Sequence, residues 1–118
     1  MSIQNALASL PVKNLSVSIQ WYEKLFGRAA DSNPMPEVAE WKFDRGGWLQ
    51  VFQATTNAGN GSVTLAVDNL AEQISDLKNL GIETGSQSGG DNVKVIMIKD
   101  PDGNSIAFAE ALDKTIAH

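Results

Sequence analysis

The chain has 118 residues, of which 42% are hydrophobic and 19% charged, the size and balance of a folded domain rather than of a disordered or membrane-embedded chain. It contains no cysteine, so disulfides, thiolate metal sites and a thiol nucleophile are all excluded, and a reducing cytoplasm is the expected location. The net charge of −5 and the scattered lysines and arginines argue against nucleic acid as a partner.

The first ten residues carry neither a basic residue nor a long apolar run, so they predict neither a signal peptide nor a membrane span. An alternating pattern over Ala6–Val12 predicts a strand. Ser16 is then placed to cap a helix that runs to about Phe26, and Gly27 to end it. The buried face of this helix is expected at Val17, Tyr22 and Leu25.

The second half of the chain begins in the same way. Val63–Val67 predicts a strand and Ala71–Leu80 a helix that Gly81 terminates, with an apolar face at Ile74, Leu77 and Leu80. Further strands are expected around residues 38–43, 48–53, 93–98 and 105–110. The segments 55–61 and 86–91 are expected to be loops, the first of them an exposed and mobile linker.

These two halves form an internal repeat. A shift of 55 residues superposes Leu10, Val12, Asn14, Leu15, Ile19 and Leu25 on Leu65, Val67, Asn69, Leu70, Ile74 and Leu80. Because the strand, the helix and the glycine stop recur in the same order, the sequence predicts two copies of one structural unit.

Two motifs inside this repeat identify a family resemblance. The first helix ends in Trp21-Tyr22-Glu23-Lys24-Leu25-Phe26-Gly27, and the last strand is preceded by Asp100-Pro101-Asp102-Gly103-Asn104. Together with the duplication they resemble the vicinal oxygen chelate superfamily of glyoxalases, bleomycin resistance proteins and extradiol dioxygenases. The resemblance covers essentially the whole chain.

That resemblance implies an α+β fold of two tandem βαβββ modules, whose curved mixed sheet surrounds a cavity that dimerisation usually completes. We therefore expect one domain over residues 1–118, with units at about 4–55 and 61–112, and a homodimer. Edge strands left by each half-sheet favour the same assembly.

The family also holds a divalent metal at four inward-facing strand positions. By alignment these positions are Leu7 and Gln50 in the first unit and Ser62 and Ala107 in the second. Leucine and alanine cannot replace the imidazole and carboxylate ligands that such ions take, so we expect no metal and no cofactor. The only histidine, His118, is the last residue and a poor anchor for a ligand shell.

What remains is a cavity for a small-molecule ligand. We expect its walls to be aromatic and apolar, with a few polar groups, and to include Leu7, Ser9, Trp48, Gln50, Phe52, Ser62 and Ala107. Trp48 and Phe52 could equally pack in the core or in a dimer interface. Trp41 favours packing or the dimer seam, and Trp21 and Tyr22 favour packing.

The carboxylates near these segments have structural interpretations. Asp100 and Asp102 lie in a strong turn sequence, and alternation turns Glu110 away from the face that carries Ala107. Glu37 and Glu40 are expected to be solvated surface carboxylates.

Three hypotheses follow. The first is a metal-independent protein of the bleomycin resistance type that encloses an aromatic or amphipathic ligand in a dimer and catalyses nothing. The second is a divergent metal-dependent lyase, isomerase or dioxygenase whose ligands have moved to Gln50, Glu110, Glu37 or Glu40. The third is a dimerising or regulatory scaffold with a closed cavity.

Overall fold

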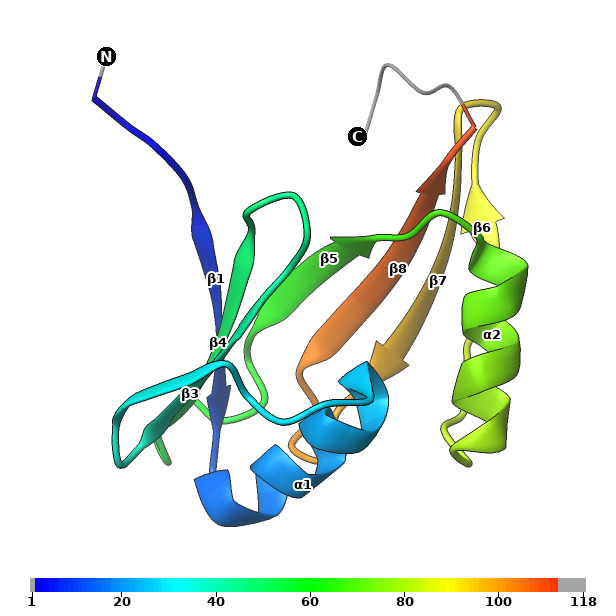
Figure 1. Cartoon of the computed structure of the whole chain (residues 1–118). Helices are drawn as coiled ribbons and strands as arrows, with labels where there is room; N and C mark the ends of the chain where they lie inside the picture. Colours follow the sequence, from blue (N-terminus) through cyan, green and yellow to red (C-terminus); the bar gives the residue numbers. More distant parts are fainter. Residues whose placement is uncertain (1, 113–118) are drawn as a thin grey trace. The chain divides into compact units, whose positions relative to one another are not determined.

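The computed structural model describes residues 2–112 and divides the chain into two compact units, each built around one sheet (Figure 1). The first unit takes the chain up to Gly61 together with Pro101–Asn104. The second takes Ser62–Asp100 and the chain from Ser105 onward. In the described part of the chain, no helix is long and apolar enough to cross a membrane.

The first unit contains a four-stranded mixed sheet and one helix. In chain order the elements are β1 (Leu7–Val12), α1 (Leu15–Phe26), β2 (Ser32–Met35), β3 (Val38–Lys42) and β4 (Trp48–Gln53). The strand order is β1-β4-β3-β2, with β1 parallel to β4 and the other pairs antiparallel. Helix α1 packs against β3 and β4.

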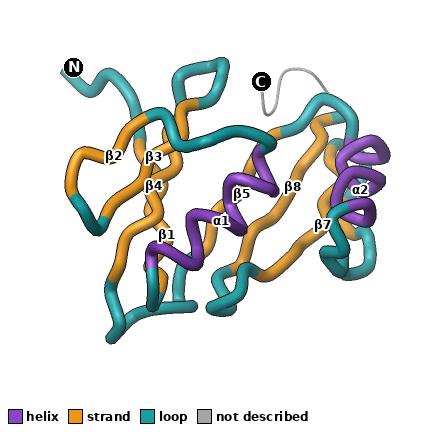
Figure 2. The backbone as a smooth tube through the Cα atoms, turned by 60° about the horizontal axis from the view of Figure 1, so that its bottom comes forward, coloured by secondary structure: helices purple, strands orange, loops and turns teal. Residues whose placement is uncertain are grey.

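The second unit repeats this connectivity (Figure 2). Its elements are β5 (Ser62–Ala66), α2 (Leu70–Asn79), β6 (Ser88–Gly89), β7 (Val93–Lys99) and β8 (Ser105–Ala111), with strand order β5-β8-β7-β6. The predicted α+β fold of two tandem βαβββ modules is therefore confirmed, with one mixed sheet in each unit. Short β6 lies inside the segment 86–91, so the expectation that this whole segment is loop was wrong.

Both helices begin at an asparagine. The side chain of Asn14 accepts a hydrogen bond from the Val17 backbone N–H, and Asn69 does the same for Glu72. The prediction that Ser16 caps the first helix was wrong, because the extended backbone needed at a cap occurs at Asn14 and Ser16 already lies inside the helix. Gly27 does end α1, with a φ of 72° that a glycine adopts without strain.

The buried faces of the helices differ in part from the expected ones. In α1 the buried residues are Leu15, Ser18, Tyr22 and Leu25, whereas Val17, expected to be buried, is 59% exposed. In α2, Leu70 and Leu77 are buried but Leu80 is largely exposed, because the helix ends at Asn79 and Leu80 is already its C-cap. Each helix begins earlier than predicted, so its first residue, Leu15 or Leu70, joins the buried face.

Aromatic side chains form the core between α1 and its sheet. Trp41 is fully buried, and its ring centroid lies 6.0 Å from that of Tyr22 and 5.4 Å from that of Phe26. The indole N–H of Trp41 donates to the carbonyl of Arg28, 3.1 Å away. Packing is thus the role of Trp41 and Tyr22, as predicted.

A charged cluster follows the end of α1. The guanidinium of Arg28 pairs with the carboxylate of Asp31 at 2.5 Å, and Asp31 also accepts from the backbone N–H of Lys42 at 2.7 Å. The hydrogen bond from Arg28 holds the pKa of Asp31 below its ordinary value of 3.8. This exposed pair links the segment after α1 to the end of β3.

Hydrogen bonds fix one end of the linker, although Thr55, Thr56, Asn57 and Asn60 are exposed as its composition predicts. The side chain of Asn104 is fully buried; its oxygen accepts from the Gly61 N–H and its nitrogen donates to the Pro11 carbonyl, both at 2.7 Å. Gly59 adopts a φ of 88° against the carbonyl of Asp102. The turn at 101–104 therefore holds the linker against the end of β1.

Candidate functional site

The helix-free face of the first sheet carries three cross-strand rows of side chains. Alternation along β4 buries Leu49 and Val51 on the side of α1 and leaves Trp48, Gln50 and Phe52 half-buried on the other. The strand register then aligns one residue from β1, β4 and β3 in each row. The rows are Leu7–Trp48–Lys42, Ser9–Gln50–Glu40 and Pro11–Phe52–Val38.

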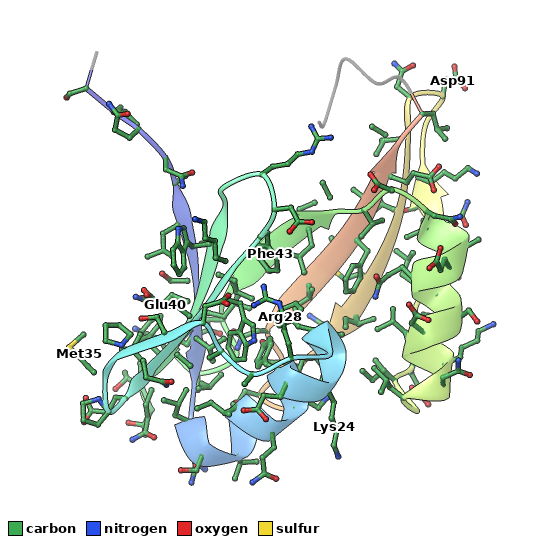
Figure 3. The ribbon with its side chains drawn as sticks, viewed as in Figure 1. Lys24, Arg28, Met35, Glu40, Phe43 and Asp91 are labelled. Carbon is green, nitrogen blue, oxygen red and sulfur yellow. The ribbon has the colours of Figure 1, made fainter. Side chains whose placement is uncertain are left out.

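The middle row is a continuous hydrogen-bonded chain, here called the polar row. The Ser9 hydroxyl donates to Oε1 of Gln50 at 3.3 Å, and Nε2 of Gln50 donates to Oε2 of Glu40 at 3.0 Å. Glu40, labelled in Figure 3, projects from β3 and is half-buried. The expectation that Glu40 is merely a solvated surface carboxylate was wrong, because the register of β3 and β4 pairs it with Gln50.

Aromatic side chains flank the polar row on both sides. Trp48 and Phe52 are the neighbours of Gln50 on the same face of β4, and both are half-buried. The ammonium of Lys42 lies 5.8 Å from the centroid of the Trp48 ring, a cation–π distance. A planar group placed on this face would therefore meet two rings and, between them, a line of oxygen and nitrogen atoms.

In the second unit, the two predicted site residues lie in neighbouring rows. Ser62 is aligned with Ser105, and Ala107 with Thr64. Ala107 is 7% exposed, whereas Ser62 is exposed. The ammonium of Lys99 donates to the Ser105 hydroxyl at 2.8 Å. This face thus offers two hydroxyl groups and one cation at one end, followed by the row Thr64–Ala107–Met97.

The family's four metal positions do not suit a metal in this chain. Leu7 and Ala107 have no donor atom, Ser62 offers one neutral hydroxyl, and the amide of Gln50 is already bonded to Ser9 and Glu40. Across residues 2–112, no group of three or more histidine, cysteine, aspartate or glutamate side chains lies close enough to hold an ion. His118 falls outside the residues that the structure describes.

The other carboxylates have structural partners or lie away from the polar row. Glu110 faces the helix side of its sheet, as predicted, and accepts from the Leu70 N–H at 2.6 Å. Gln53 plays the same part in the first unit, accepting from the Leu15 N–H at 3.0 Å. Asp102 lies in the predicted turn, 3.5 Å from the Ser18 hydroxyl, and Glu37 is exposed ahead of β3.

Residues 4–108 match the sequence model of the glyoxalase/bleomycin resistance protein/dioxygenase superfamily. The chain belongs to this superfamily. Membership confirms the resemblance that the duplicated unit and its two motifs predicted. No curated protein matches the chain significantly.

Solved structures of the superfamily have the same fold over nearly the whole chain. A glyoxalase/bleomycin resistance protein from Catenulispora acidiphila has a TM-score of 0.82 and 29% identity, covering 92% of this chain and 99% of its own. A bleomycin resistance determinant encoded on the transposon Tn5 has a TM-score of 0.78 and 19% identity, covering 94% and 100%. An antibiotic-binding protein from Streptomyces sp. CB03234 has a TM-score of 0.78 and 19% identity, covering 94% of this chain and 98% of its own.

Proposed function

We propose that this chain is a small-molecule binding protein of the bleomycin resistance type, which encloses an aromatic or amphipathic ligand without a metal and without chemical change. The observation that carries the proposal is the polar row between Trp48 and Phe52 on the helix-free face of the first sheet. Aromatic walls with a few fixed polar groups are typical of sites that bind and orient planar molecules.

The family's metal positions support binding rather than metal-dependent catalysis. Isomerisation and ring cleavage in this superfamily depend on an ion that holds two oxygens of the substrate, whereas the residues at these positions supply only an occupied amide and a hydroxyl. The structural relatives described as a bleomycin resistance determinant and an antibiotic-binding protein have the same fold, which makes an antibiotic-like molecule a reasonable first ligand class.

The ligand contacts that we propose are those predicted from the sequence. They are Leu7, Ser9, Trp48, Gln50 and Phe52 in the first unit and Ser62 and Ala107 in the second. Glu40 joins them because it is bonded to Gln50. The cytoplasm remains the proposed location, on the strength of the cysteine-free composition.

We also propose a homodimer. Each four-stranded sheet has two edge strands, β1 and β2 in one unit and β5 and β6 in the other, and such edges are commonly covered by another chain. Light scattering coupled to size-exclusion chromatography measures the mass in solution. A mass twice that of the 12.6 kDa chain is expected, and a monomeric mass would contradict the dimer.

Calorimetric titration of chelator-treated protein tests the binding function. The panel contains bleomycin, other aromatic antibiotics and simple polycyclic aromatics, and at least one is expected to bind the metal-free protein and to be released unchanged. The same protein is then offered nickel, zinc, manganese and ferrous iron. Binding or turnover seen only with near-stoichiometric metal would reject the proposal in favour of a metal-dependent lyase, isomerase or dioxygenase.

A further inference from the structure

The hydrogen bonds of the polar row all run one way, from Ser9 through Gln50 to Glu40, and this direction specifies a ligand class. Resting on the proposed binding function, we propose that the helix-free face of the first sheet selects planar ligands that donate hydrogen bonds, above all protonated aromatic amines, and rejects aromatic carboxylates. The selecting residues are Glu40 and Gln50, flanked by Trp48 and Phe52.

The direction follows from the chemistry of Glu40. An ionised carboxylate can only accept hydrogen bonds, so the amide of Gln50 must turn its NH₂ group toward Glu40. The amide oxygen then points to the other side, where it accepts from the Ser9 hydroxyl. Because that hydroxyl proton is used inside the row, the row consumes its own donors and is left with acceptors.

The hydrogen-bonding positions that the polar row leaves free for a ligand are therefore mostly acceptors. A carboxylate offers roughly four lone-pair positions, and Gln50 occupies one on Glu40. The hydroxyl of Ser9 and the amide oxygen of Gln50 each keep a further lone pair. Against these stands one remaining N–H of Gln50, so an N–H donor on the ligand finds more partners here than an acceptor does.

The negative charge of Glu40 also favours a ligand that donates hydrogen bonds. Among the residues that the structure describes, the Glu40 side chain forms no ion pair, and its hydrogen-bond partner is the neutral amide of Gln50. Lys42 lies on the same face, two residues along β3, and its ammonium is placed over the Trp48 ring in the neighbouring row. A ligand cation at Glu40 would gain a charge-assisted hydrogen bond, whereas a ligand carboxylate would meet a like charge.

Three tricyclic probes separate donation from charge and from ring stacking. At neutral pH, 9-aminoacridine is a cation with N–H donors, 10-methylacridinium is a cation without them, and acridine-9-carboxylate is an anion on the same ring system. We expect 9-aminoacridine to bind at least about tenfold more tightly than either of the others, as one hydrogen bond to a charged group allows. The dissociation constants are measured by calorimetry on the full chain.

Glu40→Gln tests the residue, with Glu37→Gln as the matched control on an exposed carboxylate of the same hairpin. A glutamine at position 40 can donate as well as accept, so it removes both the charge and the fixed direction of the row. Affinity for 9-aminoacridine is expected to fall about tenfold in Glu40→Gln and to stay unchanged in Glu37→Gln. If Glu40→Gln does not fold, the comparison of probes on the natural chain still decides.

The outcomes separate the proposed selectivity from the proposed binding function. Equal binding of 9-aminoacridine and 10-methylacridinium, or tighter binding of the carboxylate, would overturn the inference and leave the binding function intact. An unchanged affinity in folded Glu40→Gln would do the same. If none of the three probes binds, the inference falls, and the proposed function then stands or falls by the antibiotic panel alone.

Discussion

Replacing Asn104 with alanine would remove the side chain that joins the linker to the end of β1. Asn104 is fully buried, receives the Gly61 N–H and donates to the Pro11 carbonyl. Alanine makes neither bond and is too small for the space. The substitution leaves the residues of the polar row untouched, so it separates the stability of the fold from ligand binding.

The expected cost comes mainly from the Gly61 N–H. A buried donor that loses its partner costs about 1–3 kcal/mol, while the Pro11 carbonyl keeps a hydrogen bond from the Gly59 N–H at 3.2 Å and loses only about 1 kcal/mol. We therefore expect Asn104→Ala to lower the free energy of unfolding by about 3 kcal/mol. For a chain of this length, that corresponds to a fall in Tm of roughly 10 °C.

Urea unfolding followed by tryptophan fluorescence measures this loss, with calorimetry for the Tm. Asn60→Ala is the matched control, because Asn60 is exposed in the same linker, and it should change the free energy of unfolding by less than about 0.5 kcal/mol. If Asn104→Ala costs no more than Asn60→Ala, the linker is not held by these two hydrogen bonds and the reasoning fails.

Three further predictions concern stability. Gly59→Ala places a β-carbon 2.2 Å from the Asp102 carbonyl oxygen and should lower the free energy of unfolding by more than about 2 kcal/mol. Gly47→Ala is the control, because a β-carbon there meets no atom within 4 Å and should change the stability little. Thermal unfolding compares the two variants. Asn14→Ala should lower stability by about 1 kcal/mol in urea, and Ser16→Ala should leave it nearly unchanged. Because Arg28 lowers the folded pKa of Asp31, the stability gap between the natural chain and Asp31→Asn should be present above pH 3.8 and close as the pH falls further; a constant gap in acid unfolding would contradict this.

Much of the fold could be read from the repeat, because strand alternation, the helical pattern and the glycine stops are local signals. The caps show where local reasoning failed. Both Asn14 and Ser16 suit a helix start, and propensity alone cannot choose between them. The repeat held the missing information, since Asn69 is the counterpart of Asn14 and also caps its helix, whereas Ala71 at the counterpart of Ser16 cannot.

The site and the linker depended on contacts between distant residues. Glu40 resembles any exposed glutamate until the hairpin between β3 and β4 sets the register that pairs it with Gln50. The register is centred on Arg45, so counting outward from Gly46-Gly47 would have paired Gln50 with Phe43 instead. Nothing local to Gly61 shows that Asn104, 43 residues away, holds its N–H. A polar, glycine-rich composition describes only how flexible a free segment would be.

The alternation of β4 assigns its residues to two different roles, one on each face of the sheet. Leu49 and Val51 are committed to the helix side and so to the folding of the unit, while Gln50 and its flanking rings can change without disturbing that side. The second unit follows the same division, with buried Ile106 and Phe108 at the positions equivalent to Leu49 and Val51 and an alanine at the position equivalent to Gln50. The same separation makes Ser9, Gln50 and Glu40 suited to redesign for new ligands, because none of them is buried and substitutions there should leave the core intact.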